Sequence, residues 1–238
     1  ALAADDARPA VHLLARPGEI TAEELALVTG GTEAPYSPYG VHLEPGGGDV
    51  GELDAVAEGL AIVQDEVSQL VALALTRAPL LGADAGRWLD LCAGPGGKSV
   101  LLGSLLALDG GRLDAVEHSE HRADLGRRPT DGLPVDVHTA DGREAPLPDA
   151  AYDRVLVDAP CTGLGALRRR PEARWRRRPD DVAALAKLQR ELLTAALRHV
   201  RPGGVVAYIT CSPHLAETHG VLRPVLRRHS DVEQLDAR

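Results

Sequence analysis

The chain has 238 residues, of which 44% are hydrophobic and 26% charged, so it can form one sizeable core with a small appendage. It contains no apolar run near the roughly 20 residues of a membrane span, which excludes an integral helical membrane protein. A net charge of −9 does not by itself indicate a nucleic-acid-binding protein, and an odd count of 3 cysteines argues against a disulfide framework. We therefore expect a cytoplasmic protein with free thiols.

The N-terminal region, residues 1–53, is expected to form a small α+β appendage. Ala10–Leu14 alternates weakly and predicts a strand. Thr21–Leu27 predicts a short helix, with Thr21 as N-cap and Glu24 completing a capping box. Proline and glycine are frequent over residues 35–48, which places a boundary near residues 45–55. Helical periodicity then continues over residues 54–77, so the main domain is expected to span residues 54–238.

Strands and helices alternate from Arg87 onward. Strands are predicted at Arg87–Leu91, Arg112–Glu117, Val135–Thr139, Arg154–Asp158, Gly204–Ile209 and Asp231–Leu235. Helices are predicted at Ser99–Ala107, His121–Arg127, Val182–Val200 and Glu217–Arg228. This alternation predicts an α/β, Rossmann-like domain, with a mostly parallel sheet covered by helices on both faces. Because the last predicted strand is followed by so few residues, we expect that one or more C-terminal strands are missing and that the chain is a fragment.

A glycine-rich turn, Cys92 to Lys98, joins the first of these strands to its helix. Such a turn lets the backbone approach a ligand closely, and the helix N-terminus offers N–H groups to an anion. A phosphate-binding P-loop would need glycine where Cys92 stands, and a dinucleotide fingerprint would need glycine or alanine at Ser99. Asp90, just before the turn, suits a ligand with a cationic amino-acid moiety, such as S-adenosylmethionine.

Acids and cysteines follow the carboxyl ends of the other strands, where ligands bind in such sheets. Glu117 ends the second strand at the spacing of a ribose-binding acid, and Asp141 follows the third where an adenine edge would lie. Asp158 precedes Cys161 after the fourth strand, and Cys211 follows the fifth. Any one of these has an ordinary structural explanation, but their coincidence at one rim predicts an active site. The spacing of the cysteines and histidines does not fit a zinc site.

These motifs together resemble the Sun-type (RsmB-like) RNA cytosine-C5 methyltransferases. The resemblance rests on Asp90 to Lys98, Asp158-Ala159-Pro160-Cys161 and Thr210-Cys211-Ser212, in this order, and extends over most of the chain. Val63 to Gln69 and the arginine-rich segment from Arg168 to Arg178 also match the family's pattern. Glu117 departs from it, because the family usually has aspartate there, but either acid can accept hydrogen bonds from ribose hydroxyls.

The resemblance implies an S-adenosylmethionine-dependent enzyme with Cys211 as nucleophile, Cys161 acting in product release and Asp158 stabilising charge on the base. The expected cofactor contacts are Cys92, Ala93, Gly94, Pro95, Gly96, Gly97, Lys98, Glu117, Arg122, Asp141 and Asp158. The expected RNA contacts are Arg168, Arg169, Arg170, Arg174, Arg176 and Arg177, because clustered arginines can follow a phosphate backbone.

Several alternatives stay open at this stage. The Pro-Cys motif of DNA cytosine methyltransferases would make Cys161 the nucleophile instead. The substrate is expected to be small-subunit ribosomal RNA, with transfer RNA as the alternative. A binding or assembly factor without catalysis is the competing function. We expect a monomer with neither a metal site nor a membrane contact.

Overall fold

A five-stranded parallel sheet forms the centre of the computed structural model, which describes residues 9–44 and 49–236. Its strand order is β7-β6-β5-β8-β9, and all neighbouring pairs are parallel. The strands are β5 (Arg87–Asp90), β6 (Arg112–Glu117), β7 (Val135–Thr139), β8 (Tyr152–Asp158) and β9 (Val200–Ile209). The order reverses between β5 and β8, so this sheet has the switch point beside which α/β proteins bind ligands.

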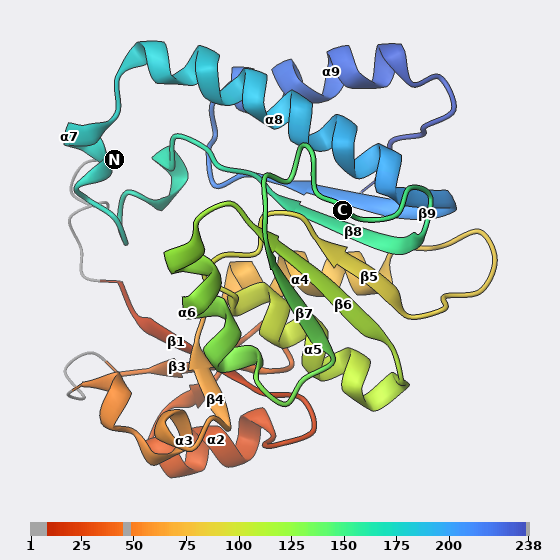
Figure 1. The fold of residues 1–238 in the computed structure, drawn as a ribbon. Helices are drawn as coiled ribbons and strands as arrows, with labels where there is room; N and C mark the ends of the chain where they lie inside the picture. The colour runs from red at the N-terminus through yellow and green to blue at the C-terminus, as the bar shows by residue number, and fades with distance from the viewer. Residues whose placement is uncertain (1–8, 45–48, 237–238) are drawn as a thin grey trace.

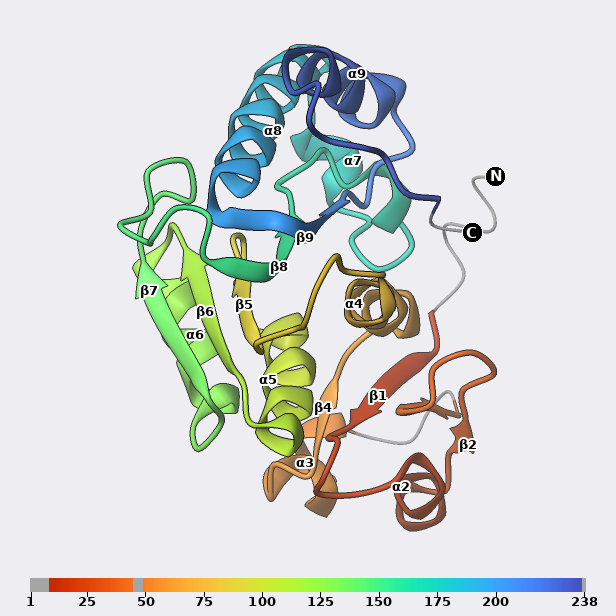
Figure 2. The ribbon, with the colours of Figure 1, turned by 90° about the vertical axis from the view of Figure 1, so that its right-hand side faces the viewer.

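Helices cover both faces of this sheet (Figures 1 and 2). On one face lie α4 (Glu66–Arg77), α5 (Gly97–Asp109) and α6 (Glu120–Thr130), and on the other lie α8 (Pro179–His199) and α9 (His219–Arg228). Leu101, Leu102 and Leu106 recur at helical spacing in α5 and are buried in one core. Leu192, Ala195 and Ala196 do the same for α8 in the core of the opposite face. The predicted Rossmann-like architecture is therefore confirmed.

A smaller antiparallel sheet, in the order β2-β3-β1-β4, forms the N-terminal part of the structure. It consists of β1 (Val11–Ala15), β2 (Thr32–Glu33), β3 (Gly40–Leu43) and β4 (Ala61–Val63), together with α2 (Ala22–Thr29), η1 (Val50–Glu52) and α3 (Asp54–Ala57). The predicted capping box is confirmed: the Glu24 N–H donates to Thr21 Oγ1 at 3.1 Å, and the Thr21 N–H donates to Glu24 Oε2 at 2.9 Å.

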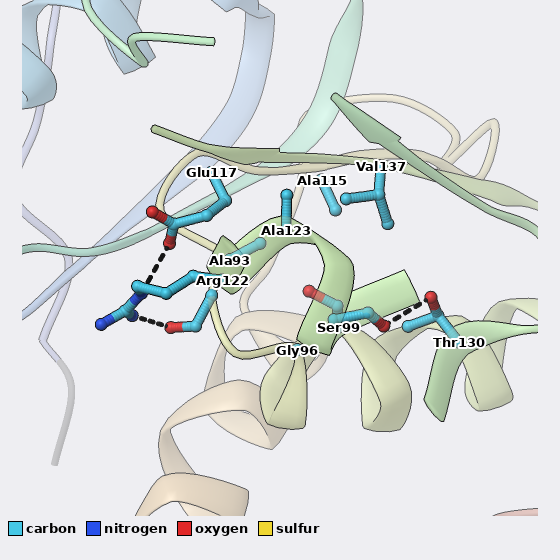
Figure 3. A pocket seen from close by; sticks show the side chains of 11 residues that line it. Ala93, Gly96, Ser99, Ala115, Glu117, Arg122, Ala123, Thr130 and Val137 are labelled. Carbon is cyan, nitrogen blue, oxygen red and sulfur yellow. Dashed lines mark hydrogen bonds and ion pairs between the residues drawn. The ribbon is translucent and has the colours of Figure 1, made fainter. Parts of the chain in front are cut away.

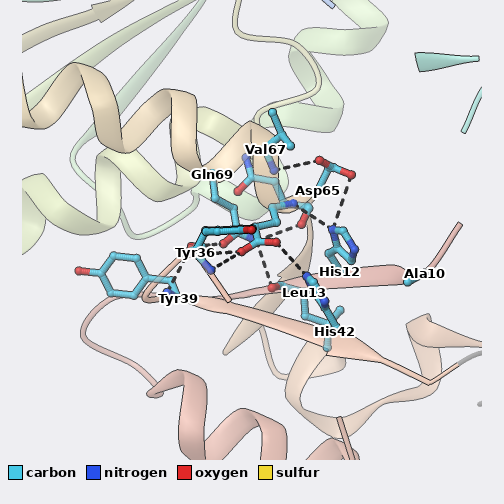
Figure 4. A network of polar contacts seen from close by, with 12 residues as sticks. Ala10, His12, Leu13, Tyr36, Tyr39, His42, Asp65, Val67 and Gln69 are labelled. Carbon is cyan, nitrogen blue, oxygen red and sulfur yellow. Dashed lines mark hydrogen bonds and ion pairs between the residues drawn. The ribbon is translucent and has the colours of Figure 1, made fainter. Parts of the chain in front are cut away.

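Successive residues of β1 serve two different cores, because side chains alternate across a strand. Leu13 packs in the core of the small sheet, whereas Leu14 packs with α4 and α5 in the core of the large one. Polar contacts add to this junction (Figure 4). Gln69 of α4 donates to the Leu13 carbonyl at 3.1 Å, and Glu66 accepts the Ser37 N–H at 3.0 Å. The small sheet is thus built onto the large domain.

Three sequence predictions of secondary structure differ from the structure. The helix expected over residues 54–77 is interrupted, because Ala61–Val63 forms β4 and pairs with β1. The small sheet therefore extends past the boundary expected at residue 53. The last strand of the large sheet begins at Val200 rather than Gly204. The strand expected at Asp231–Leu235 is wrong: these residues pair with no neighbouring strand, and Leu235 is 44% exposed. Alternation alone does not make a strand, because a strand also depends on its packing against paired neighbours.

Candidate active site

The glycine-rich turn begins where β5 ends, at Asp90, and leads directly into α5. Gly96 is the N-cap of α5 with a φ of +102°, and no side chain caps the helix start. The first N–H groups of α5 are therefore available to an anion. Asp90 is buried and accepts a hydrogen bond from Ser99 Oγ at 2.8 Å. Burial raises the pKa of Asp90 to about 6, and its bond to Ser99 ties the strand end to the helix.

A pocket lies beside this turn, between β6, α5 and α6 (Figure 3). Its lining includes Ala93, Gly94, Gly96, Glu117 and Arg122, all of which the sequence assigned to the cofactor. Arg122 Nε donates to Glu117 Oε2 at 3.2 Å, and its Nη2 donates to the Gly94 carbonyl. A Cβ at Gly94 would lie 2.7 Å from Glu117 Cδ, so only glycine leaves this acid its place over the turn.

Two further charged contacts lie at the carboxyl ends of β8 and β7. Lys98 Nζ of α5 lies 2.6 Å from Asp158 Oδ2, at the end of β8. Asp141, after β7, accepts three hydrogen bonds from the Arg143 guanidinium, which lower the pKa of Asp141 to about 2. Cys92 differs from these groups, because burial raises the pKa of its thiol well above the ordinary value and keeps it neutral.

This set of groups fits S-adenosylmethionine. The uncapped start of α5 suits the carboxylate of the methionine moiety, and Glu117 suits the ribose hydroxyls. Asp141 is ionised, so it can only accept hydrogen bonds. An acid that binds the amino group of adenine must do the same. Pro95 and Gly97 belong to the same turn, and a Cβ on Gly97 would be 3.4 Å from the Gln64 side chain, so the loop is closely packed there.

Cys161 and Cys211 lie together at the ends of the adjacent strands β8 and β9. Their Sγ atoms are 3.1 Å apart, Cys161 is buried, and Cys211 is exposed. The hydrogen bond from the Cys211 thiol lowers the pKa of Cys161 to about 6, and the same contact raises the pKa of Cys211. The contact therefore favours the proton on Cys211 and the charge on Cys161. The sequence predicted both cysteines at this rim, and the structure brings them into contact.

The arginine-rich segment, Arg168 to Arg178, follows η2 (Leu164–Ala166) and contains α7 (Ala173–Arg176). Arg169 and Arg177 are among the arginines of this segment that contact the rest of the protein. Arg169 donates to the Ala10 carbonyl of the N-terminal region at 3.1 Å and pairs with Asp65. Arg177 donates to the carbonyls of Cys161 and Thr162 at 3.1 and 3.2 Å. The segment thus reaches from the small sheet to the cysteine pair. Residues Arg168, Arg170, Arg174 and Arg176 lie on the same segment, and Trp175 among them is 88% exposed.

Sequence reasoning missed Glu217, which lies in η3 (Leu215–Glu217) and is fully buried beside both cysteine segments. Glu217 was predicted at the start of a helix, where an acid is common, so no sequence pattern indicated that it contacts the residues beside Cys161 and Cys211. Within residues 9–44 and 49–236 no cluster of three metal-ligating side chains occurs, and no helix is long and apolar enough to cross a membrane.

Comparison with known proteins identifies similar sequences. The family model described as 16S rRNA methyltransferase RsmB/F matches residues 79–238. "Putative methyltransferase Rv1407" of Mycobacterium tuberculosis is 64% identical over 237 residues, which cover 100% of this chain and 51% of that protein. "Ribosomal RNA small subunit methyltransferase B" of Erwinia tasmaniensis is 36% identical over 196 residues, covering 79% of this chain and 43% of that protein. The chain thus spans about half the length of these curated relatives.

Solved structures with a similar fold are also found. The crystal structure of PH0851 has a TM-score of 0.86 at 28% identity and covers 95% of this chain and 52% of that one. The structure of NSun6 from Pyrococcus horikoshii with SFG has a TM-score of 0.80 at 20% identity, covering 92% of this chain and 80% of that one. The second likeness shows the fold alone.

Proposed function

Because the chain belongs to the RsmB/F family of 16S rRNA methyltransferases, we propose that it methylates C5 of a cytosine in RNA through a covalent thiol intermediate. The observation that carries this proposal is the pair of thiols 3.1 Å apart at the ends of β8 and β9. One thiol can attack a base while the other handles a proton. A methyltransferase acting on a nucleophilic oxygen or nitrogen needs neither.

S-adenosylmethionine, when bound, supplies the methyl group from its sulfonium centre. The start of α5 and the acids Glu117 and Asp141 are the groups that would hold it, with Arg122 keeping Glu117 in place at 3.2 Å. Lys98 holds the carboxylate of Asp158 at 2.6 Å, at the rim shared with the cysteines. The cofactor-binding turn and the thiol pair therefore meet at the ends of neighbouring strands β5 and β8.

C5 of cytosine is a weak nucleophile until a thiolate adds to C6. We assign this addition to Cys211, because it is exposed to an incoming base and Cys161 is buried. Its proton passes to Cys161, and the new S–C6 bond moves the C5–C6 π electrons toward C5, the atom that would receive the methyl group. Asp158 accepts hydrogen bonds from the polar edge of the base, which fixes its orientation.

Loss of the C5 proton to a water molecule then restores the C5–C6 double bond, and the S–C6 bond breaks as Cys161 returns its proton to the leaving sulfur of Cys211. Cys161 is assigned to this release, because its sulfur lies within hydrogen-bond distance of the leaving sulfur. One observation favours the reverse assignment: the lowered pKa of Cys161 makes it the sulfur that carries the charge in the pair. The two assignments differ in which variant accumulates the covalent adduct.

The proposed RNA-binding surface is the arginine-rich segment with exposed Trp175. Arginine side chains bind phosphates, and an exposed indole can stack on an unpaired base. Attack on C6 requires the target base to leave its stack, so an unpaired region of the RNA is the expected substrate. Small-subunit ribosomal RNA is proposed because relatives carry that name.

Transfer of tritiated methyl groups to small-subunit ribosomal RNA and to transfer RNA tests the function. Cys161→Ala should accumulate a covalent RNA adduct, and Cys211→Ala should form neither adduct nor methylated RNA. Calorimetric binding of S-adenosylmethionine to each variant controls for the integrity of the cofactor site. Methylation by Cys211→Ala would reverse the cysteine roles, and cofactor and RNA binding by the wild type without methyl transfer would favour the non-catalytic alternative.

A further inference from the structure

Glu217 is a fully buried acid that the proposed chemistry does not use. Its two carboxyl oxygens accept four hydrogen bonds. Oε1 accepts the Thr162 N–H at 2.9 Å and Gln189 Nε2 at 3.0 Å, and Oε2 accepts the hydroxyls of Thr162 and Ser212, each at 2.5 Å. Four donors satisfy the four principal acceptor positions of a carboxylate.

These donors belong to both cysteine segments. Thr162 is the neighbour of Cys161, and Ser212 is the neighbour of Cys211. Gln189 of α8 reinforces the first segment, because the same amide also donates to the Pro160 carbonyl at 2.8 Å. One carboxylate therefore joins the residues that adjoin the two reactive sulfurs. The carbonyl of Glu217 is itself held by the Tyr208 hydroxyl of β9 at 2.7 Å.

The hydrogen bonds of Glu217 suit the ionised acid. The Thr162 N–H and the Gln189 amide N–H donate to Oε1, and both hydroxyls can donate to Oε2 when it carries no proton. Burial raises the pKa of Glu217, but the hydrogen bonds from Ser212 and Thr162 outweigh it and leave that pKa below the ordinary value. The network is therefore complete at neutral pH with the acid charged.

We propose that Glu217 is a positioning residue that sets the separation of Cys161 and Cys211; this inference rests on the proposed function. Two contacts that do not involve Glu217 also cross the segments: Thr162 Oγ1 lies 3.0 Å from Ser212 Oγ, and the Gly165 N–H donates to the Cys211 carbonyl at 2.9 Å. Glu217 binds side chains on both segments at once, so it fixes the direction in which each segment presents its cysteine. Proton exchange between the sulfurs needs that direction as well as proximity.

Glu217→Gln is the main test, because it keeps the size of the side chain but removes the charge and replaces the oxygen that accepts from both hydroxyls with an NH2 group. The matched control is Asp153→Asn, another buried carboxylate, which binds the Ala85 and Arg87 N–H groups at 3.1 Å near the opposite end of β8. We expect Glu217→Gln to lower kcat for methyl transfer by roughly 10- to 100-fold while the KM values for RNA and cofactor change little. Asp153→Asn should keep kcat and lose only thermal stability.

A second readout needs no catalysis. Phenylarsine oxide condenses with two close thiols, forming two As–S bonds and releasing water, so its affinity for the Cys161–Cys211 pair reports their separation. We expect Glu217→Gln to bind it at least roughly tenfold more weakly than the wild type and Asp153→Asn to match the wild type, with the adduct located by peptide mass spectrometry. If Glu217→Gln does not fold, Ser212→Ala, which removes one of the four donors, should show a smaller loss in the same direction.

The outcomes separate the two ideas. Wild-type arsenical affinity in a folded Glu217→Gln overturns the positioning role, whether or not methyl transfer is detected. Where Glu217→Gln does not fold, the same result in Ser212→Ala overturns it. Loss of arsenical affinity in Glu217→Gln, with no methyl transfer by the wild type, supports the positioning role and refutes the proposed function.

Discussion

Replacing Gly96 by alanine tests how tightly the glycine-rich turn, the proposed cofactor site, is built. Gly96 has a φ of +102°, which an L side chain rarely adopts. An added Cβ would also lie 2.8 Å from Gly126 Cα and 3.2 Å from the Gly126 carbonyl oxygen. Both are backbone atoms of α6, so no side-chain rotation can relieve the contact. The turn and α6 must move apart.

The cost has two parts. Holding alanine at this φ costs about 1–3 kcal/mol, and forcing packed backbones apart costs about 1–3 kcal/mol more. The expected loss of unfolding free energy is therefore about 2–6 kcal/mol. Gly110→Ala is the matched control: its φ is +85°, but nothing lies within 4 Å of its added Cβ. That variant should lose only about 1 kcal/mol, since strain is partly offset by the lower entropy of its unfolded chain.

Urea denaturation followed by circular dichroism measures both losses, and calorimetry measures binding of S-adenosylmethionine. We expect Gly96→Ala to weaken cofactor binding, because the first turn of α5 moves with it, and Gly110→Ala to leave it unchanged. Equal losses of stability in the two variants would refute the reasoning, since only the contact with Gly126 distinguishes them.

Two further predictions concern the thiols and the arginines. Alkylation of Cys161 by iodoacetamide should rise with pH around a midpoint near 6, because its thiolate is present above that pKa and is lost below it. In Cys211→Ala the thiol that lowers this pKa most is gone and burial stays, so the midpoint should rise; an unchanged midpoint would contradict the hydrogen bond from Cys211 as the cause. Arg170→Ala should reduce the dependence of RNA affinity on log salt concentration by about 0.7 for a single strand, and an unchanged slope would exclude a phosphate contact. Arg169→Ala should chiefly lower stability, since its side chain holds the Ala10 carbonyl and Asp65.

The sequence predicted the large sheet well because its signals are local. The strands from Arg87 to Asp158 are short segments rich in apolar residues, and β5 and β6 are each followed by a turn and a helix. The rim residues followed from topology, since parallel strands bring their carboxyl ends to one edge. The contact between Cys161 and Cys211, 50 positions apart, is a consequence of β8 pairing with β9.

What the sequence did not predict depends on long-range contacts. The pairing of β4 with β1 overrides a helical pattern, and it becomes visible only when Leu13 and Val63 lie side by side. The contacts of Arg169 and Arg177 with the protein itself are equally invisible in a run of arginines, which reads as uniform surface charge. Glu217 looks like an ordinary helix-start acid until the two segments that it joins are in place.

The two-sided strand β1 has a consequence for how the protein unfolds. Leu13 and Leu14 are consecutive and fully buried in different cores, so β1 cannot leave the small sheet without opening the large one. The two sheets should accordingly melt in one cooperative transition, and backbone amides of β1 should exchange with solvent as slowly as those of β5. Removing the small sheet from the large one would expose the apolar side of α4 to water, and that exposed surface would favour association with other molecules.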